Sequence, residues 1–356
     1  MAETETGLNE EAVGALSKAK KEPAWLQQQR LAAFKAFEEL PMPQLSYGLH
    51  VTAPLNIALN DLRPIENITS HKSYSEGNVI VEDLSVAAAK YEDAVRPLMT
   101  SSDFRNKLEA LHLAFWNSGI FVYAPKRKSK EIAQHVTLHL GQKQTEIVAI
   151  VVVAEENANL VVTESIAETA ATEGKAYRIE GVSIKAAPNS TVKFATLQKL
   201  GSNANSIIVR KALAEKDATV DWVDVSIGGG SMRQETVTAL NGEGANSTIT
   251  GAFFGDGSQQ LDIMAKEVHS ARNTKSNIRI KGALQGKAKA IVQSFTKIMK
   301  TAANSEGHQK ANVLLLSDTA RASPIPKLEI DNYDVKASHE AAVGQLDSEK
   351  LFYLMS

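Results

Sequence analysis

A turn followed by a short apolar strand recurs through the middle of the chain, and this repeat constrains the fold more than any other feature. The spacing between units is roughly 28 to 32 residues, which is typical of stacked-repeat architectures. A single unit has too little apolar surface to fold alone, so neighbouring units must stack to build a continuous core. The four clearest units are Asn157–Val162, Asn189–Phe194, Asp217–Trp222 and Ala245–Thr250.

Two architectures stack short strands in this way, a parallel β-helix and a β-sandwich. Aromatic residues make up only 6% of the chain, and the small and β-branched residues that recur between the turns suit the narrow interior of a β-helix. Two-residue hairpin signals, which a sandwich needs, are sparse; Asn241-Gly242 and Asp256-Gly257 are the clear ones. The pattern therefore favours a mainly β fold with a parallel β-helix core.

The segments on either side of this core have helical rather than strand-like sequence patterns. Pro23–Leu40 has apolar residues at helical spacing, and Ser85–Trp116 forms a second helical zone. We expect a mostly helical region over residues 1–115 and the β-helix core over 116–336. Residues 337–356 would hold the end of the core and the start of a C-terminal helical region. That region begins with an N-cap at Asp347 and breaks off within its apolar pattern, so we expect it to be incomplete here.

Composition narrows the function classes. The formal net charge of −2 argues against a general electrostatic grip on nucleic acid. The longest apolar run, Ile147–Ala154, is far shorter than the about 20 residues that span a bilayer, and the acidic N-terminus does not resemble a secretory signal. We therefore expect a cytoplasmic protein with neither nucleic acid nor membrane as a partner. The absence of cysteine excludes disulfides and any thiolate ligand from this chain.

Three ordered segments near the C-terminus together resemble the core motif of the SufB/SufD family, whose members are scaffold proteins of iron–sulfur cluster assembly. They are His308–Ala320, Pro326–Ile330 and Asp334–Gly344, followed by Leu346-Asp347 and Leu351–Leu354. Two weaker matches extend the likeness over nearly the whole chain, and they are Glu22–Pro43 and Phe115–Lys126.

The resemblance implies a specific assembly. In the family, a right-handed parallel β-helix lies between helical N- and C-terminal regions, and two subunits pair through their β-helices as a homodimer or a heterodimer. Each attaches to the SufC ATPase, an ABC-type enzyme, through the C-terminal helical region. A nascent iron–sulfur cluster then forms transiently at the subunit interface. This chain has no G-x-x-x-x-G-K-[ST] motif, so we expect a non-enzymatic scaffold whose ATPase comes in trans.

The resemblance also points to one candidate site. The family's interface histidine corresponds to His339, a possible metal ligand, and Glu340 follows it; both are candidates for the cluster-assembly site. Ala337 and Ala320 stand at or near positions that carry cysteine in relatives, so thiolate chemistry is lost here. On a strand, His339 and Glu340 would point to opposite faces and could not bind one ion without a bend or a second subunit. The competing interpretation is an ordinary polar pair beside a subunit contact.

Three further motifs have simpler interpretations. His135 and His139 alternate with apolar residues, which predicts a strand with the two imidazoles about 13 Å apart, too far for one ion. The glycine run Ile227–Ser231 could cradle a phosphate, but a tight turn between coils fits its strand-like flanks better. The basic run Lys126–Lys130 predicts a solvated loop.

Two other function classes compete with the scaffold. A secreted-type β-helix carbohydrate-active enzyme would need clustered carboxylates, whereas Asp221, Asp224 and Asp256 are scattered. An iron-binding accessory protein would need His and carboxylate clusters, which are scarce. Within the family the role stays open, because Glu340 is SufB-like and Asp334–Lys336 is SufD-like.

Overall fold

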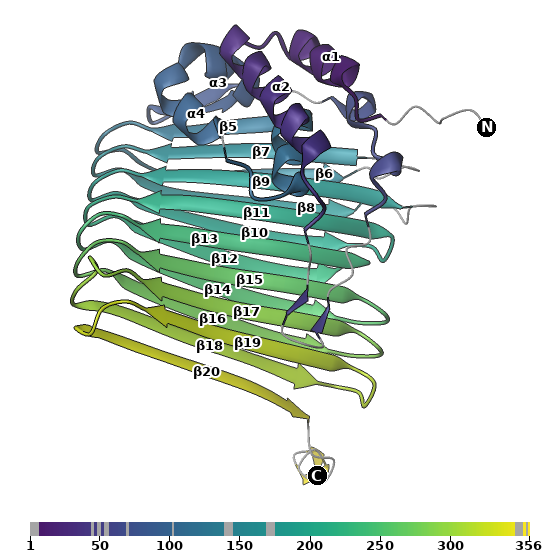
Figure 1. Cartoon of the computed structure of the whole chain (residues 1–356), viewed down its shortest axis with the longest axis vertical. Coiled ribbons are helices and arrows are strands. Elements are labelled where there is room, and N and C mark those ends of the chain that lie inside the picture. The colour runs from purple at the N-terminus through teal and green to yellow at the C-terminus, as the bar shows by residue number, and fades with distance from the viewer. Residues whose placement is uncertain are drawn as a thin grey trace.

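The chain folds into a parallel β-solenoid of about seven turns with a layer of helices at its N-terminal end (Figure 1). This is a computed structural model, and it describes residues 7–43, 46–47, 51–52, 57–68, 71–101, 103–138, 145–168, 175–345, 352–353 and 355–356. The mainly β fold and the parallel solenoid core confirm the architecture that the repeat predicts.

The helical layer is built from the N-terminal third of the chain. Its helices are α1 (Glu10–Lys20), α2 (Ala24–Glu39), α3 (Leu84–Lys90), α4 (Glu92–Met99) and α5 (Lys107–Phe115), with short 3₁₀ turns η1 (Leu59–Asp61) and η2 (Pro64–Asn67). Asn9 and Asn106 cap α1 and α5 by accepting hydrogen bonds from first-turn amides. Helices α2 to α5 lie where the apolar spacing predicts them, whereas α1 was not predicted.

Four short strands accompany the helices: β1 (Ser46–Tyr47), β2 (Val51–Thr52), β3 (Tyr74–Glu76) and β4 (Val79–Asp83). β1 and β2 pair with each other, and β3 and β4 extend the edge of the larger solenoid sheet in antiparallel fashion. The irregular segment between the two helical zones therefore contributes pairing to the N-terminal end of the solenoid.

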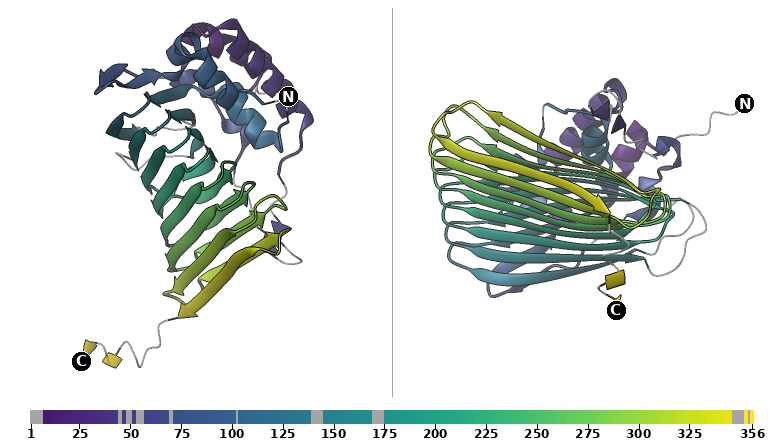
Figure 2. Two further views of the ribbon diagram at one scale, coloured as in Figure 1. Left: turned by 90° about the vertical axis from the view of Figure 1, so that its left-hand side faces the viewer. Right: turned by 90° about the horizontal axis from the view of Figure 1, so that it is seen from below.

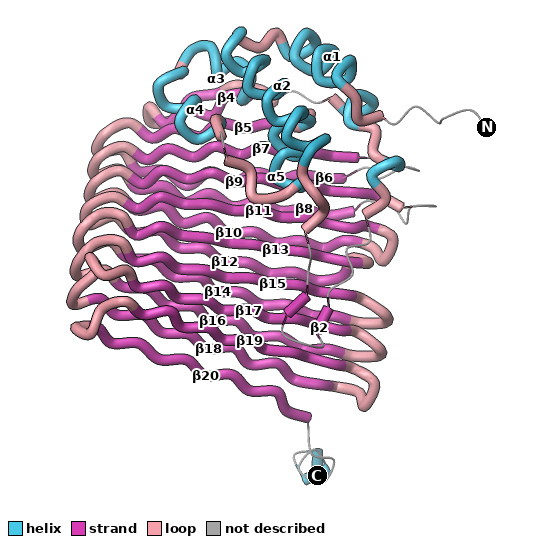
Figure 3. Tube along the Cα trace, viewed as in Figure 1, coloured by secondary structure: helices cyan, strands magenta, loops and turns pink. Residues whose placement is uncertain are grey.

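Each coil of the solenoid contributes one strand to each of two sheets (Figures 2 and 3). The eight-stranded sheet contains β6 (Ser129–Leu138), β8 (Asn159–Glu168), β10 (Thr191–Leu200), β12 (Thr219–Gly228), β14 (Asn246–Gly255), β16 (Lys275–Leu284), β18 (Ser305–Leu315) and β20 (Val335–Gln345). The ten-stranded sheet contains, besides β3 and β4, β5 (Ser118–Ala124), β7 (Thr145–Ala154), β9 (Ala176–Ala186), β11 (Ala204–Ala214), β13 (Ser231–Leu240), β15 (Gln260–His269), β17 (Lys289–Ile298) and β19 (Arg321–Ile330).

The four sequence repeats are neighbouring strands of the eight-stranded sheet. In the first three, Leu160, Val192 and Val220 pair side by side, as their alignment predicts. The fourth is displaced by one residue, because Val220 pairs with Ser247 and not with Thr248. Gly244, and not Ala245, takes the left-handed place that an Asn or Asp occupies in the earlier turns, and the turn before β14 is one residue longer than those before β10 and β12.

These left-handed turn residues form a hydrogen-bonded ladder along one edge of the solenoid. The backbone N–H of Asn189, for example, donates to Lys216 O at 2.9 Å, in the next coil. Asn, Asp and Gly tolerate positive φ better than other residues, which explains the turn composition. The ladder contains Arg127, Asn157, Asn189, Asp217, Gly244, Asn273 and Asn304.

The helices cover one face of the solenoid near its N-terminal end. Outward side chains of the ten-stranded sheet, including Ile147, Val151 and Ile179, share an apolar cluster with α1 to α5. The inward side chains form a second, longer core that runs through the coils. No helix in the described ranges is long and apolar enough to cross a membrane.

Candidate functional site: the open end of the solenoid

The last coil is formed by β19 and β20, and no described residue covers it at the C-terminal end of the solenoid. β20 is the edge of the eight-stranded sheet, and β19 is the edge of the other (Figure 2). Val313 on β18 is 3% exposed, whereas Val343, its register partner on β20, is 41% exposed. Tyr333, in the turn between β19 and β20, is fully exposed. We refer to β19, β20 and this turn as the open end.

The register of β20 places His339 and Glu340 on opposite faces of the sheet. His339 pairs with Gln309, which is 3% exposed and faces the solenoid interior. Glu340 pairs with Lys310 on the outer face, and their side chains form an ion pair at 2.9 Å. Adjacent strand residues alternate in direction, so His339 lies on the interior side of the open end and Glu340 on its outer side.

The outer face beside Glu340 is a row of exposed polar pairs. His308 Nδ1 and Ser338 Oγ are 2.7 Å apart, and Lys336 Nζ lies 3.2 Å from Glu306 Oε1. Exposed ion pairs of this kind contribute about 0–1 kcal/mol, so this row does not explain the stability of the last coil. The row gives the outer face a mixed charge pattern.

Beneath His339, Gln309 is held from the opposite sheet. Its Nε2 donates to Thr296 Oγ1 at 2.7 Å and to Lys327 O at 3.0 Å. Ala337 pairs with Gly307 on the interior side, and Ala320 is fully buried just before β19. With alanine at both places, His339 is the residue on the interior side of β20 whose side-chain type can ligate a metal.

A shallow groove of about 340 Å³ crosses the outer face beside the edge strand. Small residues of β20, Ala342 and Gly344, form its outer wall, and Lys281 and Asn312 lie further in. The Oδ1 atom of Asn312 is buried without a hydrogen-bond partner. The edge strand β20 therefore borders a groove on its outer face and has exposed side chains on its inner face.

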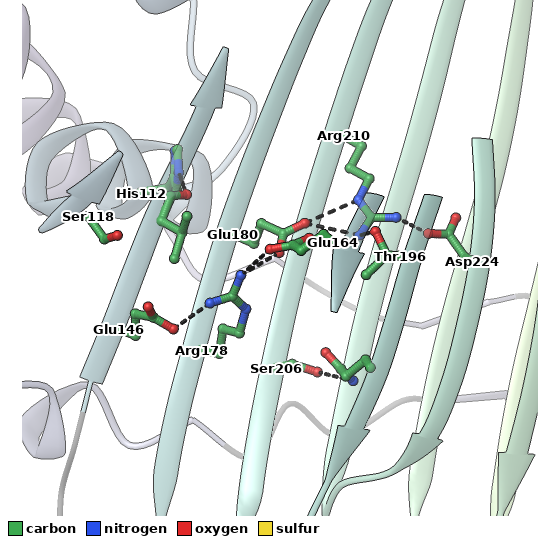
Figure 4. A network of polar contacts seen from close by, with 12 residues as sticks. His112, Ser118, Glu146, Glu164, Arg178, Glu180, Thr196, Ser206, Arg210 and Asp224 are labelled. Atoms are coloured by element: carbon green, nitrogen blue, oxygen red, sulfur yellow. Dashed lines mark hydrogen bonds and ion pairs between the residues drawn. The ribbon is translucent and has the colours of Figure 1, made fainter. Parts of the chain in front are cut away.

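An ion-pair network fills the solenoid interior near the other end (Figure 4). The guanidinium of Arg178 contacts Glu146, Glu164 and Glu180, and that of Arg210 contacts Glu180 and Asp224. Both arginines are almost completely buried. Such a network is costly to desolvate, and it persists only because nearly every charge has a partner.

The acids of this network have opposite pKa shifts. Burial, reinforced by the nearby charge of Glu180, raises the pKa of Glu164 to about 8. Burial also acts on Glu180, but the guanidinium groups of Arg210 and Arg178 outweigh it and hold the pKa of Glu180 below its usual value. Glu164 therefore holds a proton more readily than Glu180.

A second polar cluster occupies the interior between this network and the open end. Burial raises the pKa of Glu267 to about 8, and Ser247 Oγ donates to one of its oxygens at 2.9 Å. His269 lies between Thr274 and Ser276 with both ring nitrogens 2.8 Å from a hydroxyl, and burial lowers its pKa to about 4. His269 is thus a neutral, fully bonded core residue.

Sequence reasoning did not find these interior polar groups. Arg178 and Glu180, like Glu267 and His269, occupy alternate positions of strands whose other alternate residues face outward. The sequence signal for these residues is the two-residue alternation of a strand. It indicates that they are buried only when one knows which alternate set of side chains faces inward.

Other sequence candidates do not join the open end. Gly229 N donates to Leu200 O and Gly230 N to Ala204 O, so the glycine run is a turn between β12 and β13, as predicted, with these amides already bonded. Lys126 lies in the turn after β5 and pairs with Glu156. The histidine pair falls outside the described residues, because His139 and the side chain of His135 are not described.

The acids considered for an enzyme are separated as well. Asp224 faces the interior and pairs with Arg210, whereas Asp221 lies on the outward side of the same strand. Asp256 lies in the turn after β14, where its side chain accepts from Gly257 N. These three carboxylates do not form a pair for glycoside chemistry, which needs two carboxyl groups flanking one bond.

The fold is that of a parallel β-solenoid protein whose last strands, β19 and β20, are exposed sheet edges. A family model described as "SUF system FeS cluster assembly, SufBD core domain" matches residues 137–356. The chain belongs to this SufBD family of the SUF iron–sulfur cluster assembly system.

Curated relatives agree with this assignment. The iron–sulfur cluster assembly protein SufD of Bacillus subtilis (strain 168) is 27% identical over an alignment of 393 positions. The alignment covers 99% of this chain and 90% of that protein. An iron–sulfur cluster assembly SufBD family protein of Staphylococcus haemolyticus is 25% identical over 99% of this chain and 85% of that protein. Both comparisons extend over the helical layer as well as the solenoid.

Proposed function

We propose that this chain is a non-enzymatic scaffold subunit of the SUF assembly. It pairs at its open end with a second SufBD-family subunit, either a copy of itself or a relative, and works with a SufC-type ABC ATPase. A nascent iron–sulfur cluster is its cargo and is held transiently at the subunit interface. The observation that carries this proposal is the uncovered last coil with His339 on its interior side.

The open end has the chemistry of an incomplete interface. A solenoid needs a cap or a partner at each end, and an unpaired edge strand offers a row of free backbone groups for pairing. The helices occupy the N-terminal end, whereas β20 has apolar and small side chains exposed where its neighbours are buried. A second subunit would bury these side chains and complete the sheet.

The imidazole of His339 is chemically suited to bind an iron–sulfur cargo. A neutral imidazole binds iron, and His can replace Cys on an iron–sulfur cluster. The chain has no cysteine, so any thiolate ligand of a cluster must come from the partner or from the cargo. Glu340 faces the other side of the sheet and would reach the same cluster only across the interface.

Pairing can be tested with matched substitutions on one sheet. Val343→Asp places a charge at the open end, and Leu197→Asp places the same charge on the outer face of β10; the two side chains are 41% and 45% exposed. We expect size-exclusion chromatography with light scattering to show a dimer for the wild type and Leu197→Asp, and a monomer for Val343→Asp. A wild-type chain that stays monomeric alone and with a SufBD relative would contradict the pairing.

The ATPase partnership is tested separately by co-purification with a SufC-type ATPase in the presence of nucleotide. We expect binding for the wild type and for Val343→Asp, because the family resemblance implies attachment through the C-terminal helical region that follows β20 and not through the strand that carries Val343. Failure of the wild-type protein to retain the ATPase would remove the ATPase from this proposal without affecting the pairing.

A further inference from the structure

Gln309 interrupts an apolar column inside the solenoid. One inward register column of the eight-stranded sheet is buried and apolar through five coils, and it then becomes polar at Gln309 and His339. The buried apolar members are Val162, Phe194, Trp222, Ile249 and Ile278. An apolar residue would continue the packing of this column. Packing alone therefore does not explain why an amide, Gln309, occupies the coil next to His339.

The orientation of the Gln309 amide is fixed by its partners. The Lys327 carbonyl can only accept, so the Gln309 atom 3.0 Å from it must be the donating Nε2. The same Nε2 also reaches Thr296 Oγ1. The amide oxygen, Oε1, is therefore the other terminal atom, and it is buried without a hydrogen-bond partner. A buried acceptor that lacks a donor destabilises a fold unless a group outside the core supplies one.

The register places one candidate donor, His339, beside Gln309. It follows Gln309 in the register and lies on the same face, and paired strands are about 4.8 Å apart, so the two side chains are within reach of each other. Within the described part of the chain, the His339 ring forms no hydrogen bond, and the residue is exposed, so its ring is free to turn. A neutral imidazole has one N–H donor and one acceptor nitrogen.

We infer that Gln309 is a positioning residue, whose Oε1 accepts a hydrogen bond from one ring N–H of His339. This bond holds the proton on the ring nitrogen that faces the core and leaves the lone pair of the other nitrogen directed out of the open end. Histidines that bind metals commonly donate their second N–H to a carbonyl or carboxylate in this way. The use of that lone pair for an iron–sulfur cluster rests on the proposed function; the hydrogen bond itself does not.

The test reads the tautomer of His339 directly. Imidazole ¹⁵N signals of the full-length, metal-free protein are recorded at mildly alkaline pH, and His339→Asn identifies the signals by their loss. Gln309→Leu removes the acceptor. The matched control is Asn312→Leu, which removes an amide with an equally unpartnered buried oxygen from the same strand but on its outer face.

We expect the wild type and Asn312→Leu to give one protonated and one unprotonated nitrogen signal, which is the pattern of a single tautomer. In Gln309→Leu the two signals should move toward each other as the tautomers exchange. Averaged signals in the wild type, or unchanged signals in folded Gln309→Leu, would overturn the inference. Because no iron is present, this test does not depend on the cargo: a fixed tautomer together with unchanged cluster assembly in His339→Ala would contradict the proposed function and not this hydrogen bond.

Discussion

The guanidinium of Arg30 donates to both carboxylate oxygens of Glu22, at 2.7 and 2.8 Å, and neither side chain has any exposed surface. The remaining donors of Arg30 reach the carbonyls of Ala114 and Trp116, and its plane lies 4.0 Å from the Trp116 ring centroid. One buried side chain thus ties α2 to the end of α5, at the point where the chain enters the first solenoid strand.

Arg30→Met should therefore loosen the helical layer. Removing one partner of a buried pair leaves an uncompensated carboxylate, which typically costs about 3–5 kcal/mol. Arg96→Met is the control, because Arg96 forms an exposed pair with Glu92 within α4, and its loss should cost less than about 0.5 kcal/mol. The measurement is the free energy of unfolding in urea. Equal effects for the two substitutions would refute the role of Arg30.

Gly282 allows the Phe253 ring to lie against the backbone of β16. A Cβ at this position would lie 2.0 Å from the ring, so Gly282→Ala should cost about 1–3 kcal/mol by overpacking. Combining it with Phe253→Leu should cost less than the sum of the single changes, because the clash is relieved. Gly344→Ala is the control, since nothing lies within 4 Å of the place that its added Cβ would take, and the thermal midpoint should not change. Strict additivity of the first pair would contradict the contact.

Glu267 gives the fold a dependence on pH. Its pKa is raised from 4.5 to about 8, so between these values the folded chain keeps a proton that the unfolded chain has released. Stability from this group is therefore present below pH 4.5 and is lost as the pH rises through about 8. Glu267→Gln stays neutral and should gain thermal stability relative to the wild type as the pH is raised from about 5 to about 8.

The control for this titration is Glu340→Gln, which removes a carboxylate from the exposed outer face. Its difference from the wild type should remain small at every pH, because an exposed pair contributes about 0–1 kcal/mol. The measurement is the thermal midpoint of the wild type, Glu267→Gln and Glu340→Gln between about pH 5 and pH 8. A constant difference between Glu267→Gln and the wild type would show that the Glu267 pKa is not raised.

His339→Ala should separate folding from function. The residue is exposed in the single chain, so we expect pairing to persist and the thermal midpoint to fall by no more than the loss of one hydrogen bond to Gln309 explains. If His339 binds the cargo, iron–sulfur enzyme activity in cells that depend on this chain should fall several-fold. Glu340→Gln provides the comparison on the opposite face of β20. Unchanged activity for His339→Ala would remove this residue from the proposed site.

Much of the solenoid could be predicted from the sequence, because its repeat has local causes. Left-handed Asn and Asp residues mark the turns, and alternating apolar residues mark the strands that follow. The prediction was wrong by one residue at the fourth unit, since the left-handed turn residue is Gly244 and the unit was aligned on Ala245. Helix α1 was not predicted, although Asn9 provides its cap, because its apolar face is formed by few residues: Leu8, Ala12, Val13 and Leu16.

The candidate site was less accessible to sequence reasoning. The family resemblance located His339, and the strand geometry correctly placed Glu340 on the opposite face. The role of Gln309 depends on the phase of β18 and on Lys327 from the other sheet, and the two residues meet only through coiling. Likewise, the partners of Arg178 come from three different strands, so no local pattern reveals that network.

The most direct test of the scaffold assignment is complementation in cells of the source organism. The gene for this chain is deleted, and the activity of an iron–sulfur enzyme such as aconitase is measured with and without a plasmid copy. We predict that activity falls on deletion and returns with the wild-type copy, while the abundance of the enzyme polypeptide stays constant. Normal activity in the deletion strain, with no second SufBD-family gene present, would contradict the account.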